Sequence, residues 1–347
     1  MNGGSGRHDA EETRRHIASA MQAAARSYRI FVIEDASQIQ STAQQAVDAA
    51  REQGGVVVAV GGDGTINAVA NTVLGSGCLF GAIPQGTFNY FGRTHGIPEE
   101  IGDALDDLLQ GEPVPVQVGL VNDHVFLVNA SVGLYPELLE DREAFKQQYG
   151  RSRLVAIWAA IATVFGRHRT LNMVLEQEGE RVTMRTTTLF VGNNRLQLEQ
   201  VGMPQAQAVV QGQLAAIAVR PIGKLAMLWL GACGALGRLG DAENVVGFSF
   251  RKLTIAPRGK HFAAKDTSKT DTKSVGKRSN KIKVAADGEI MWLRPPLEFR
   301  VASESLLLIK RRHASDTENE THRAAESDSA AVDDKADWKT RLEGDAA

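Results

Sequence analysis

The apolar positions in the first third of the chain alternate between helical spacing and short continuous runs. The predicted helices cover about 10–27 and 36–53, and the predicted strands cover 28–33, 56–60 and 79–84. On the second helix, Ile39, Ala43 and Val47 fall on one face at helical spacing. Helices that alternate with apolar strands indicate βαβ units and a parallel sheet.

The pattern changes after about Val114, where strand-like runs begin to dominate. These runs cover 116–122, 124–132, 171–177, 181–192, 213–220, 245–256 and 298–310, with helical stretches at about 136–147 and 152–167. We therefore predict an α/β domain over 1–115. A β-rich, sandwich-like and mostly antiparallel second domain should cover 116–312, with its last residues packing back on the first domain.

Two segments fall outside both predicted cores. Residues 258–283 carry nine Lys or Arg against two Asp, which predicts a mobile basic loop. Residues 313–347 carry ten acidic against four basic residues, which predicts a disordered acidic tail.

Composition excludes several classes of protein. With 39 Lys and Arg against 41 Asp and Glu among 347 residues, the net charge of −2 argues against a nucleic-acid partner. Two cysteines, Cys78 and Cys233, fit a reducing cytoplasm. The apolar stretches 154–165 and 225–236 are too short to cross a bilayer and predict buried or amphipathic helices, so any membrane contact should be peripheral. Trp229 is accordingly expected in the core or at an interface.

A glycine-rich turn directly follows the predicted strand 56–60. Its residues are Gly61-Gly62-Asp63-Gly64-Thr65. A strand that feeds such a turn and a helix presents backbone N–H groups to an anion, and glycine lets a phosphate approach closely. A carboxylate at Asp63 suits this place if it holds Mg²⁺, directly or through water. An ordinary tight turn with an aspartate helix cap remains open.

A second turn, Pro84-Gln85-Gly86-Thr87-Phe88-Asn89, follows the next predicted strand. Because parallel sheets bind ligands outside the carboxyl ends of their strands, the two turns can line one nucleotide site. The hydroxyls of Thr65 and Thr87 would then donate to phosphates. Simple helix capping by Thr87 and Asn89 is the alternative.

A third candidate, Asp287-Gly288-Glu289, lies far away in the sequence, after the strand-like run 282–286. Two carboxylates that flank a glycine can supply a general base. Asp-Gly is also a common hairpin turn, so a purely structural role remains open.

Together, in this order and spacing, these elements resemble the diacylglycerol kinase catalytic-domain superfamily. Further segments that match are Gly81-Ala82-Ile83-Pro84, Gly92-Arg93, Asn129-Ala130-Ser131-Val132-Gly133 and Val191-Gly192-Asn193-Asn194. The resemblance extends from the N-terminus to about Arg311. It implies a nucleotide-binding α/β domain packed on a β-rich domain, with ATP and a lipid head group in the cleft between them.

The resemblance also implies roles for individual residues. Asp63, Glu289 and Asp287 would be catalytic, with Glu289 as the proton acceptor and Asp63 at the catalytic Mg²⁺. The residues implied to bind ATP are Asn2, Ser5, Gly6, Gly61, Gly62, Asp63, Gly64, Thr65, Ile66, Asn67, Gly86 and Thr87. The reaction implied is transfer of the γ-phosphoryl group of ATP to a lipid hydroxyl, such as that of diacylglycerol.

The sequence departs from the family pattern at two places. The turn Asn2-Gly3-Gly4-Ser5-Gly6 is preceded only by Met1, so either the family's first apolar strand is missing or the start of the chain is wrongly placed. Without that strand we expect unpaired groups on its neighbours and a poorly anchored ATP turn. Where some relatives hold a structural Mg²⁺ with an aspartate, this chain has Gln211-Gly212, so we predict that this second metal site is absent.

Three functions are weighed on these features. We expect a cytoplasmic, ATP- and Mg²⁺-dependent lipid kinase that meets its lipid at a membrane surface, in peripheral contact with the inner face. A NAD kinase-like enzyme shares the first glycine turn, and a non-catalytic relative that binds lipid or nucleotide is the third reading. The identity of the lipid and the oligomeric state, a homodimer included, are left open.

Overall fold

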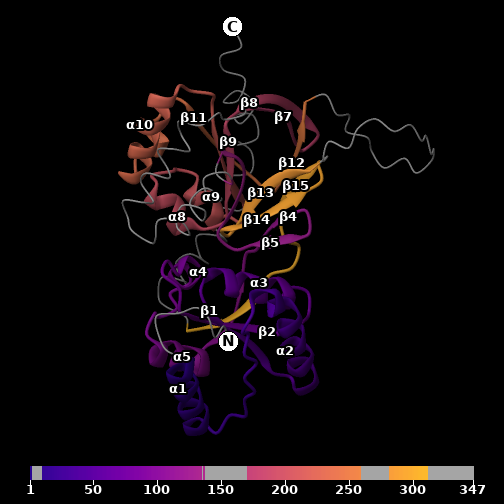
Figure 1. The fold of residues 1–347 in the computed structure, drawn as a ribbon, viewed down its shortest axis with the longest axis vertical. Coiled ribbons are helices and arrows are strands. Elements are labelled where there is room, and N and C mark those ends of the chain that lie inside the picture. The colour runs from indigo at the N-terminus through magenta and orange to yellow at the C-terminus, as the bar shows by residue number, and fades with distance from the viewer. Residues whose placement is uncertain (2–9, 135, 137–169, 259–280, 312–347) are drawn as a thin grey trace, which may run out of the picture.

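The computed structural model describes residues 1, 10–134, 136, 170–258 and 281–311, which form an α/β domain and a β-rich domain. The two domains lie one above the other along the longest axis, with strand β1 and helix α4 in the first domain and α8 in the second (Figure 1). The architecture predicted from the sequence is therefore confirmed.

The first domain is built on a four-stranded sheet in the order β1-β2-β16-β3. Strands β1 and β2 are parallel, and β16 pairs with β2 in parallel and with β3 antiparallel. The last strand of the described chain thus lies inside the sheet of the first domain. The strands are β1 (Val56–Gly61), β2 (Leu79–Pro84), β3 (Glu112–Val116) and β16 (Leu306–Lys310), and the helices are α1 (Ala10–Ala23), the short 3-10 helix η1 (Ala36–Gln38), α2 (Ile39–Gln53), α3 (Asp63–Val73), α4 (Tyr90–Thr94) and α5 (Ile101–Gln110).

The segment 28–33 is not a strand, which corrects the sequence-based prediction. A strand needs a neighbour to bond with, and among the residues that the structure describes, the partner of this segment is Met1 alone. The Met1 amino group donates to Phe31 O at 2.8 Å, and the Ile33 N–H donates to Met1 O at 2.8 Å. These two bonds follow the parallel ladder pattern, but they extend no further along 28–31.

A large cavity lies along the outer edge of β1. Among the described residues, β1 pairs only with β2, and the cavity on its other side has a volume of about 840 Å³. Its lining includes Ile17, Phe31, Ala46, Val58 and Leu108. Among the described residues, the outer edge of β1 therefore faces a cavity that is lined largely by apolar side chains.

The second domain contains two six-stranded sheets. Their orders are β11-β10-β9-β6-β13-β14 and β5-β4-β15-β12-β7-β8, and all the pairings within them are antiparallel. A core that includes Phe126, Phe250 and Phe299 lies within this domain. The strands are β4 (Gly119–Val121), β5 (His124–Phe126), β6 (Asn129–Gly133), β7 (Leu171–Gln177), β8 (Glu180–Thr186), β9 (Thr188–Gly192), β10 (Leu214–Val219), β11 (Val245–Phe250), β12 (Lys252–Pro257), β13 (Ile282–Ala286), β14 (Glu289–Leu293) and β15 (Leu297–Val301).

Several long apolar runs that we predicted as single strands are divided in the structure. The runs 181–192 and 245–256 each break in the middle and continue in the other sheet, as β8 and β9 and as β11 and β12. The run 124–132 likewise becomes β5 and β6, because the N–H groups of residues 127–129 bind a side chain rather than a neighbouring strand. Hydrophobicity stays high through such a crossing, since both sheets face one core.

In the described part of the second domain, three helices and one 3-10 helix accompany the two sheets. They are α8 (Arg195–Gln200), α9 (Ala206–Val210), α10 (Lys224–Ala235) and η2 (Leu239–Asp241). In the described part of the chain, no helix is long and apolar enough to span a bilayer. The predicted helices at 136–147 and 152–167, most of the basic loop and nearly all of the acidic tail lie outside the described residues.

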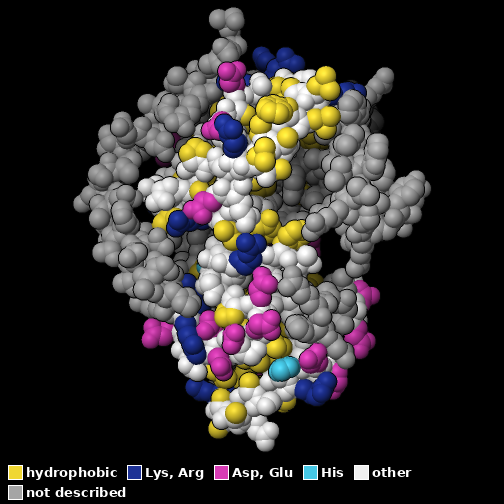
Figure 2. Space-filling model, turned by 90° about the vertical axis from the view of Figure 1, so that its left-hand side faces the viewer, with side chains coloured by type: hydrophobic (Ala, Val, Ile, Leu, Met, Phe, Trp, Pro, Cys, Tyr) yellow, Lys and Arg dark blue, Asp and Glu magenta, His cyan; other side chains and the backbone are white. Residues whose placement is uncertain are grey.

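Helix α10 is more exposed than the sequence suggests. Trp229, which we expected in a core or interface, is 71% exposed. Figure 2 turns this side of the molecule toward the viewer and shows hydrophobic side chains gathered over its upper part. The prediction of a helix over 225–236 is confirmed, whereas the prediction that Trp229 is covered is wrong.

Candidate functional site

The first glycine turn joins β1 to α3 as predicted. Gly61 ends the strand, Gly62 is the N-cap residue and Asp63 opens the helix, with no side chain capping the first turn. A Cβ atom on Gly61 would lie 2.8 Å from the Thr65 Cβ, so only glycine fits there. The uncapped N–H groups at this helix start can therefore receive an anion.

The second turn touches the first. The Gln85 N–H donates to Gly61 O at 2.8 Å, and a Cβ on Gly86 would lie 2.9 Å from the Gly62 Cα. The two backbones thus pack directly against each other at the carboxyl ends of β1 and β2. The first turn is held from this side, which corrects our expectation that it is poorly anchored.

Two polar side chains face this pair of turns. One carboxylate oxygen of Asp63 accepts from the Phe91 N–H at 3.2 Å, which fixes the carboxylate beside α4. Asn89 is 2% exposed, and its Oδ1 finds no partner among the described residues. That oxygen and the Asp63 N lie 2.9 Å and 3.6 Å from the position that a Cβ on Gly86 would take. An unpaired buried oxygen at this place is suited to a cation or a bound donor.

The third candidate segment meets the other two. Asp287 and Gly288 form the turn of the hairpin β13–β14, and Glu289 begins β14. A Cβ on Gly64 would lie 3.9 Å from Glu289 Oε1. The Glu289 carboxylate of the second domain therefore lies beside Gly64 at the start of α3 in the first domain. Asp63 is the residue that precedes Gly64 in that helix.

Asp287 is engaged very differently from Glu289. Its Oδ2 accepts from the Leu127 N–H at 2.6 Å and from Asn67 Nδ2 at 2.7 Å. Its Oδ1 accepts from the N–H groups of Val128 and Asn129 at 2.9 and 2.8 Å. Burial raises the pKa of Asp287 to about 6, although these four donors oppose the rise. Both oxygens are thus occupied by the protein itself.

The side chains of Ile66 and Asn67 point away from the glycine turns. Ile66 is fully buried in the core of the first domain. Asn67 Nδ2 donates to Val125 O at 3.1 Å as well as to Asp287. These two side chains are therefore engaged within the protein, and the prediction that residues 61–67 bind ATP phosphates stays a prediction for their backbone groups.

Two asparagines near the site make different contacts, Asn193 within the second domain and Asn194 across to the first. Asn193 Nδ2 donates to Gln117 O and Leu127 O, both at 3.2 Å, and its Oδ1 accepts from the Gln117 amide at 2.7 Å. The Asn194 side chain donates to Tyr90 O of the first domain at 3.3 Å. Sequence analysis identified this pair only as family landmarks.

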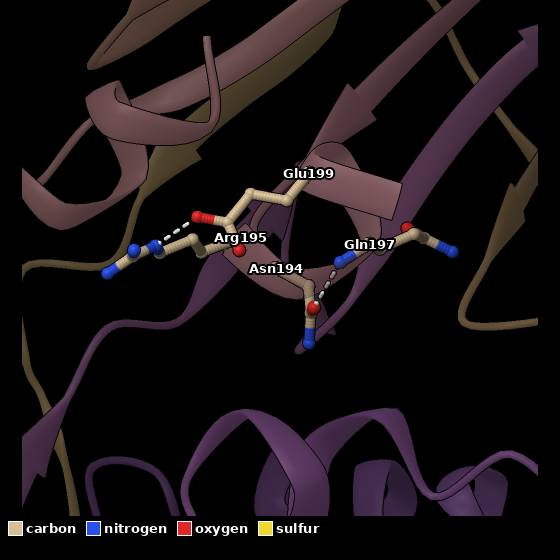
Figure 3. A network of polar contacts seen from close by, with 4 residues as sticks. All are labelled: Asn194, Arg195, Gln197 and Glu199. Carbon is tan, nitrogen blue, oxygen red and sulfur yellow. Dashed lines mark hydrogen bonds and ion pairs between the residues drawn. The ribbon is translucent and has the colours of Figure 1, made fainter. Parts of the chain in front are cut away.

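Figure 3 shows how Asn194 begins α8 above the helices of the first domain. Its Oδ1 accepts from the Gln197 N–H at 2.9 Å, which caps the helix. Arg195 and Glu199 form an ion pair one turn apart on the same short helix. The cap leaves the Asn194 amide free to reach across the domain junction.

Sequence analysis missed Gln85 as an anchoring residue. Its side chain is buried and donates to Thr13 Oγ1 of α1 at 2.8 Å. The partners are 72 positions apart, so no local pattern could pair them. A buried glutamine within the second turn was the only available signal.

The remaining predicted residues divide into two groups. Thr65 is buried and Thr87 is exposed at the second turn, so both flank the candidate phosphate site. Asn2, Ser5 and Gly6 lie outside the described residues. Over the parts of the chain that the structure describes, no cluster of three acidic, histidine or cysteine side chains could hold a metal ion alone.

Solved structures share this fold. A crystal structure of a diacylglycerol kinase from Bacillus anthracis superimposes with a TM-score of 0.60 and 17% sequence identity, covering 89% of this chain and 94% of that one. At this identity the similarity establishes the fold.

Curated relatives match only part of the chain. A diacylglycerol kinase from Bacillus subtilis is 40% identical over 99 residues, which are 28% of this chain and 33% of the relative. An uncharacterized protein, sll0036, from Synechocystis is 31% identical over 170 residues, which are 48% of this chain and 38% of the relative. The matched stretches thus span little more than a third of each relative. Residues 1–121 match the family model described as the diacylglycerol kinase catalytic domain. This matched region contains both glycine turns, so the first third of the chain is similar to that catalytic domain, as the turns predict.

Proposed function

We propose that the chain is an ATP-dependent lipid kinase that transfers the γ-phosphoryl group of ATP to a lipid hydroxyl. The proposal rests on one observation. Gly64 and Glu289, which are 225 positions apart in the sequence, lie next to each other in the structure. A carboxylate over an uncapped helix start is the arrangement that brings a proton acceptor to a bound phosphate chain.

The start of α3 would bind the phosphates. The N–H groups of the first helical turn have no partner within the helix and carry the positive end of its dipole. Direct packing of Gly62 on Gly86 keeps side chains away from this place, so a phosphate can approach the backbone. Thr65 lies in the first turn of α3 and Thr87 lies in the second glycine turn, so their hydroxyls would add further contacts to the phosphates.

The residues present fit a magnesium ion. Asp63 supplies a carboxylate and Asn89 a buried amide oxygen without a partner, and Mg²⁺ prefers such oxygen ligands while keeping several waters. With one carboxylate available, phosphate oxygens and water would complete the coordination. When bound, the ion would neutralise the charge that develops on the transferring phosphoryl group.

Glu289 would take the proton of the lipid hydroxyl as its oxygen attacks the γ-phosphorus. The bond from that phosphorus to the bridging oxygen breaks, and ADP leaves with the electron pair. Positioning and charge neutralisation supply most of such a catalysis. Glu289 is exposed at the start of β14, so it is free to meet a substrate from the cleft.

Asp287 would be a positioning residue rather than a second base. Its four hydrogen bonds tie the hairpin that carries Glu289 to the segment 127–129 and, through Asn67, to α3. This clamp fixes Glu289 relative to Asp63. A displacement of about 1 Å in such a constellation can lower the rate about 100-fold.

The second metal site stays predicted as absent. Gln211 offers only a neutral amide, and the Arg251 guanidinium lies 3.5 Å from the position of a Cβ on Gly212. A fixed positive charge at this place repels a divalent cation. A crystallographic or spectroscopic Mg²⁺ bound near Gln211 would contradict the prediction.

Transfer of labelled phosphate from ATP to a panel of lipids tests the proposal. We expect a phosphorylated lipid with the wild type, and a loss of about 100-fold or more in kcat for Glu289→Gln and for Asp63→Asn. The matched controls are Asp123→Asn and Glu243→Gln, two exposed carboxylates away from the glycine turns, which should retain activity. Retained activity in both site variants would refute the assignment.

The same assay separates the competing functions. Phosphorylated NAD or sugar in place of lipid would indicate a NAD kinase-like enzyme. ATP binding without any product would indicate a non-catalytic relative. A peripheral location at the inner face of the cytoplasmic membrane follows only if the product is a lipid.

A further inference from the structure

Helix α10 presents an aligned row of large apolar side chains to solvent. Leu225 is 77% exposed, Trp229 71% and Leu236 74%. At 100° per residue, these three positions fall within about 40° of one another around the helix axis. We refer to them as the α10 stripe.

The stripe is not ordinary surface. Single exposed apolar residues are common, but aligned ones indicate a partner. Lys224 is the only charged residue in the twelve residues of α10, and a helix this apolar is normally buried on all sides. Only Leu230 of this helix is fully covered in the structure. The composition of α10 therefore suits an environment that is apolar on its outer face.

The helix is fixed to the domain at its C-terminal end. The Leu239 N–H donates to Val201 O at 2.9 Å, and a Cβ on Gly202 would overlap Gly237 O. Val201 and Gly202 directly follow α8, which lies between α10 and α4 in Figure 1. A six-residue helix is about 9 Å long. The base of α10 is therefore one short helix away from Asn194, which contacts the first domain.

We propose that α10 is a membrane-contact helix that lies in the surface of an anionic bilayer with its stripe inserted. Tryptophan and leucine side chains on the outward face of a helix are typical of contact with a membrane surface, and basic residues close to that surface add attraction to anionic lipids. Lys224 opens the helix and Arg220 precedes it, whereas Arg238 after the helix is paired with Asp241 at 3.1 Å and the helix itself contains no acidic residue. The preference for a bilayer over another apolar partner rests on the proposed lipid kinase function.

A second copy of the chain fits the stripe less well. The exposed face is about 18 Å long and about 10 Å wide, which is a few hundred Å² at most. A specific dimer buries about 800 Å² on each partner. The stripe alone is therefore too small for a stable dimer, whereas insertion of two or three large side chains is enough for reversible membrane contact.

Binding to vesicles without ATP tests the proposal. The full chain is sedimented with vesicles of phosphatidylcholine and phosphatidylglycerol at a ratio of about 3:1, a composition that supplies anionic head groups. We expect the variant L225S/W229S to bind at least about tenfold more weakly than the wild type, since each of these side chains gains free energy on leaving water. The matched control L307S/W292S removes one exposed leucine and one exposed tryptophan elsewhere and should bind like the wild type.

A fluorescence measurement locates the contact. In a chain whose other tryptophans, Trp158, Trp292 and Trp338, are replaced by phenylalanine, the emission of Trp229 should shift to shorter wavelength on adding vesicles. Equal vesicle binding by L225S/W229S and the wild type, absence of wild-type binding, or an unchanged Trp229 spectrum would each overturn the proposal.

Light scattering without vesicles tests whether a second copy of the chain, rather than a bilayer, covers the α10 stripe. A wild-type dimer that becomes a monomer in L225S/W229S would show that a second copy covers the stripe, and would overturn the proposal. The vesicle result and the kinase assay are independent readouts. Failure of phosphate transfer with intact, stripe-dependent vesicle binding would contradict the proposed function and leave the membrane contact standing.

Discussion

Strand β1 borders two regions of opposite character. At its carboxyl end, the region around the domain junction is dense with hydrogen bonds, four of them to the single carboxylate of Asp287, of which the one from Asn67 crosses between the domains. Along its outer edge lies a cavity of about 840 Å³, closed at one end by two hydrogen bonds to Met1. The bonds that place the candidate site thus come from β2 and from the second domain. Site geometry and the stability of the outer edge should therefore be separable.

The largest effect on stability is expected from breaking the junction at Asp287. Asp287→Ala leaves three backbone N–H groups and the Asn67 amide without their acceptor, and each unpaired buried donor is costly. We expect the free energy of unfolding to fall by roughly 3 kcal/mol, measured by urea denaturation. Asp123→Ala, at an exposed turn, is the control and should change it by less than about 0.5 kcal/mol.

The contrast with Glu289→Gln sharpens this prediction. That variant should lose turnover while keeping its unfolding midpoint, because Glu289 is exposed. If Asp287→Ala were as stable as the wild type, the four hydrogen bonds of Asp287 would contribute nothing to the free energy of unfolding. The proposed positioning role of Asp287 would then be contradicted.

Sequence reasoning located the glycine turns but not every element around them. Gly61, Gly62 and Gly86 could be placed because a glycine-rich turn directly after an apolar strand is suited to binding an anion, whereas the role of Glu289 was implied by the resemblance to the kinase superfamily. The role of Asp287 could not be predicted, since its backbone donors lie 158 to 160 positions earlier. The points where the chain passes from one sheet to the other could not be predicted either, because apolar residues continue through each of these points.

A similar limit explains the failed strand at 28–33. Its composition favours a strand, but an isolated extended segment has no ladder partner and gains little. The strand could form only beside a neighbouring strand, and in the described part of the chain Met1 is the only such neighbour.

Filling the hollow edge should give the next largest effect. An extension of about five apolar residues fused ahead of Met1 would run parallel to 28–31, in the direction set by the two Met1 bonds, and pair with β1. It would also replace the Met1 amino group, whose pKa is lowered by burial, with an uncharged amide. We expect the free energy of unfolding to rise by on the order of 2 kcal/mol, after the entropy of ordering the added residues is offset against their burial.

A glycine and serine extension of the same length is the control for this experiment. It can pair but brings no apolar surface to the cavity, so it should leave the unfolding midpoint nearly unchanged. Equal midpoints for both extensions would show that the cavity does not accept a strand. Kinase activity should respond little to either, because the glycine turn is anchored from β2.

The smallest effect expected is a pH dependence that belongs to the junction alone. The pKa of Asp287 is about 6 in the folded chain, against an ordinary value of 3.8. The folded state therefore holds this proton to higher pH than the unfolded state does, so the contribution of Asp287 to stability is fully present below about pH 4. This contribution to the free energy of unfolding declines as the pH rises through about 6, and it is constant at higher pH. The difference in midpoint between wild type and Asp287→Asn, which cannot titrate there, should accordingly decrease from pH 4.5 to 6.5 in thermal unfolding. The opposite slope would mean that the four N–H donors outweigh burial and hold the pKa of Asp287 below its ordinary value, and the clamp would then be a permanently ionised carboxylate.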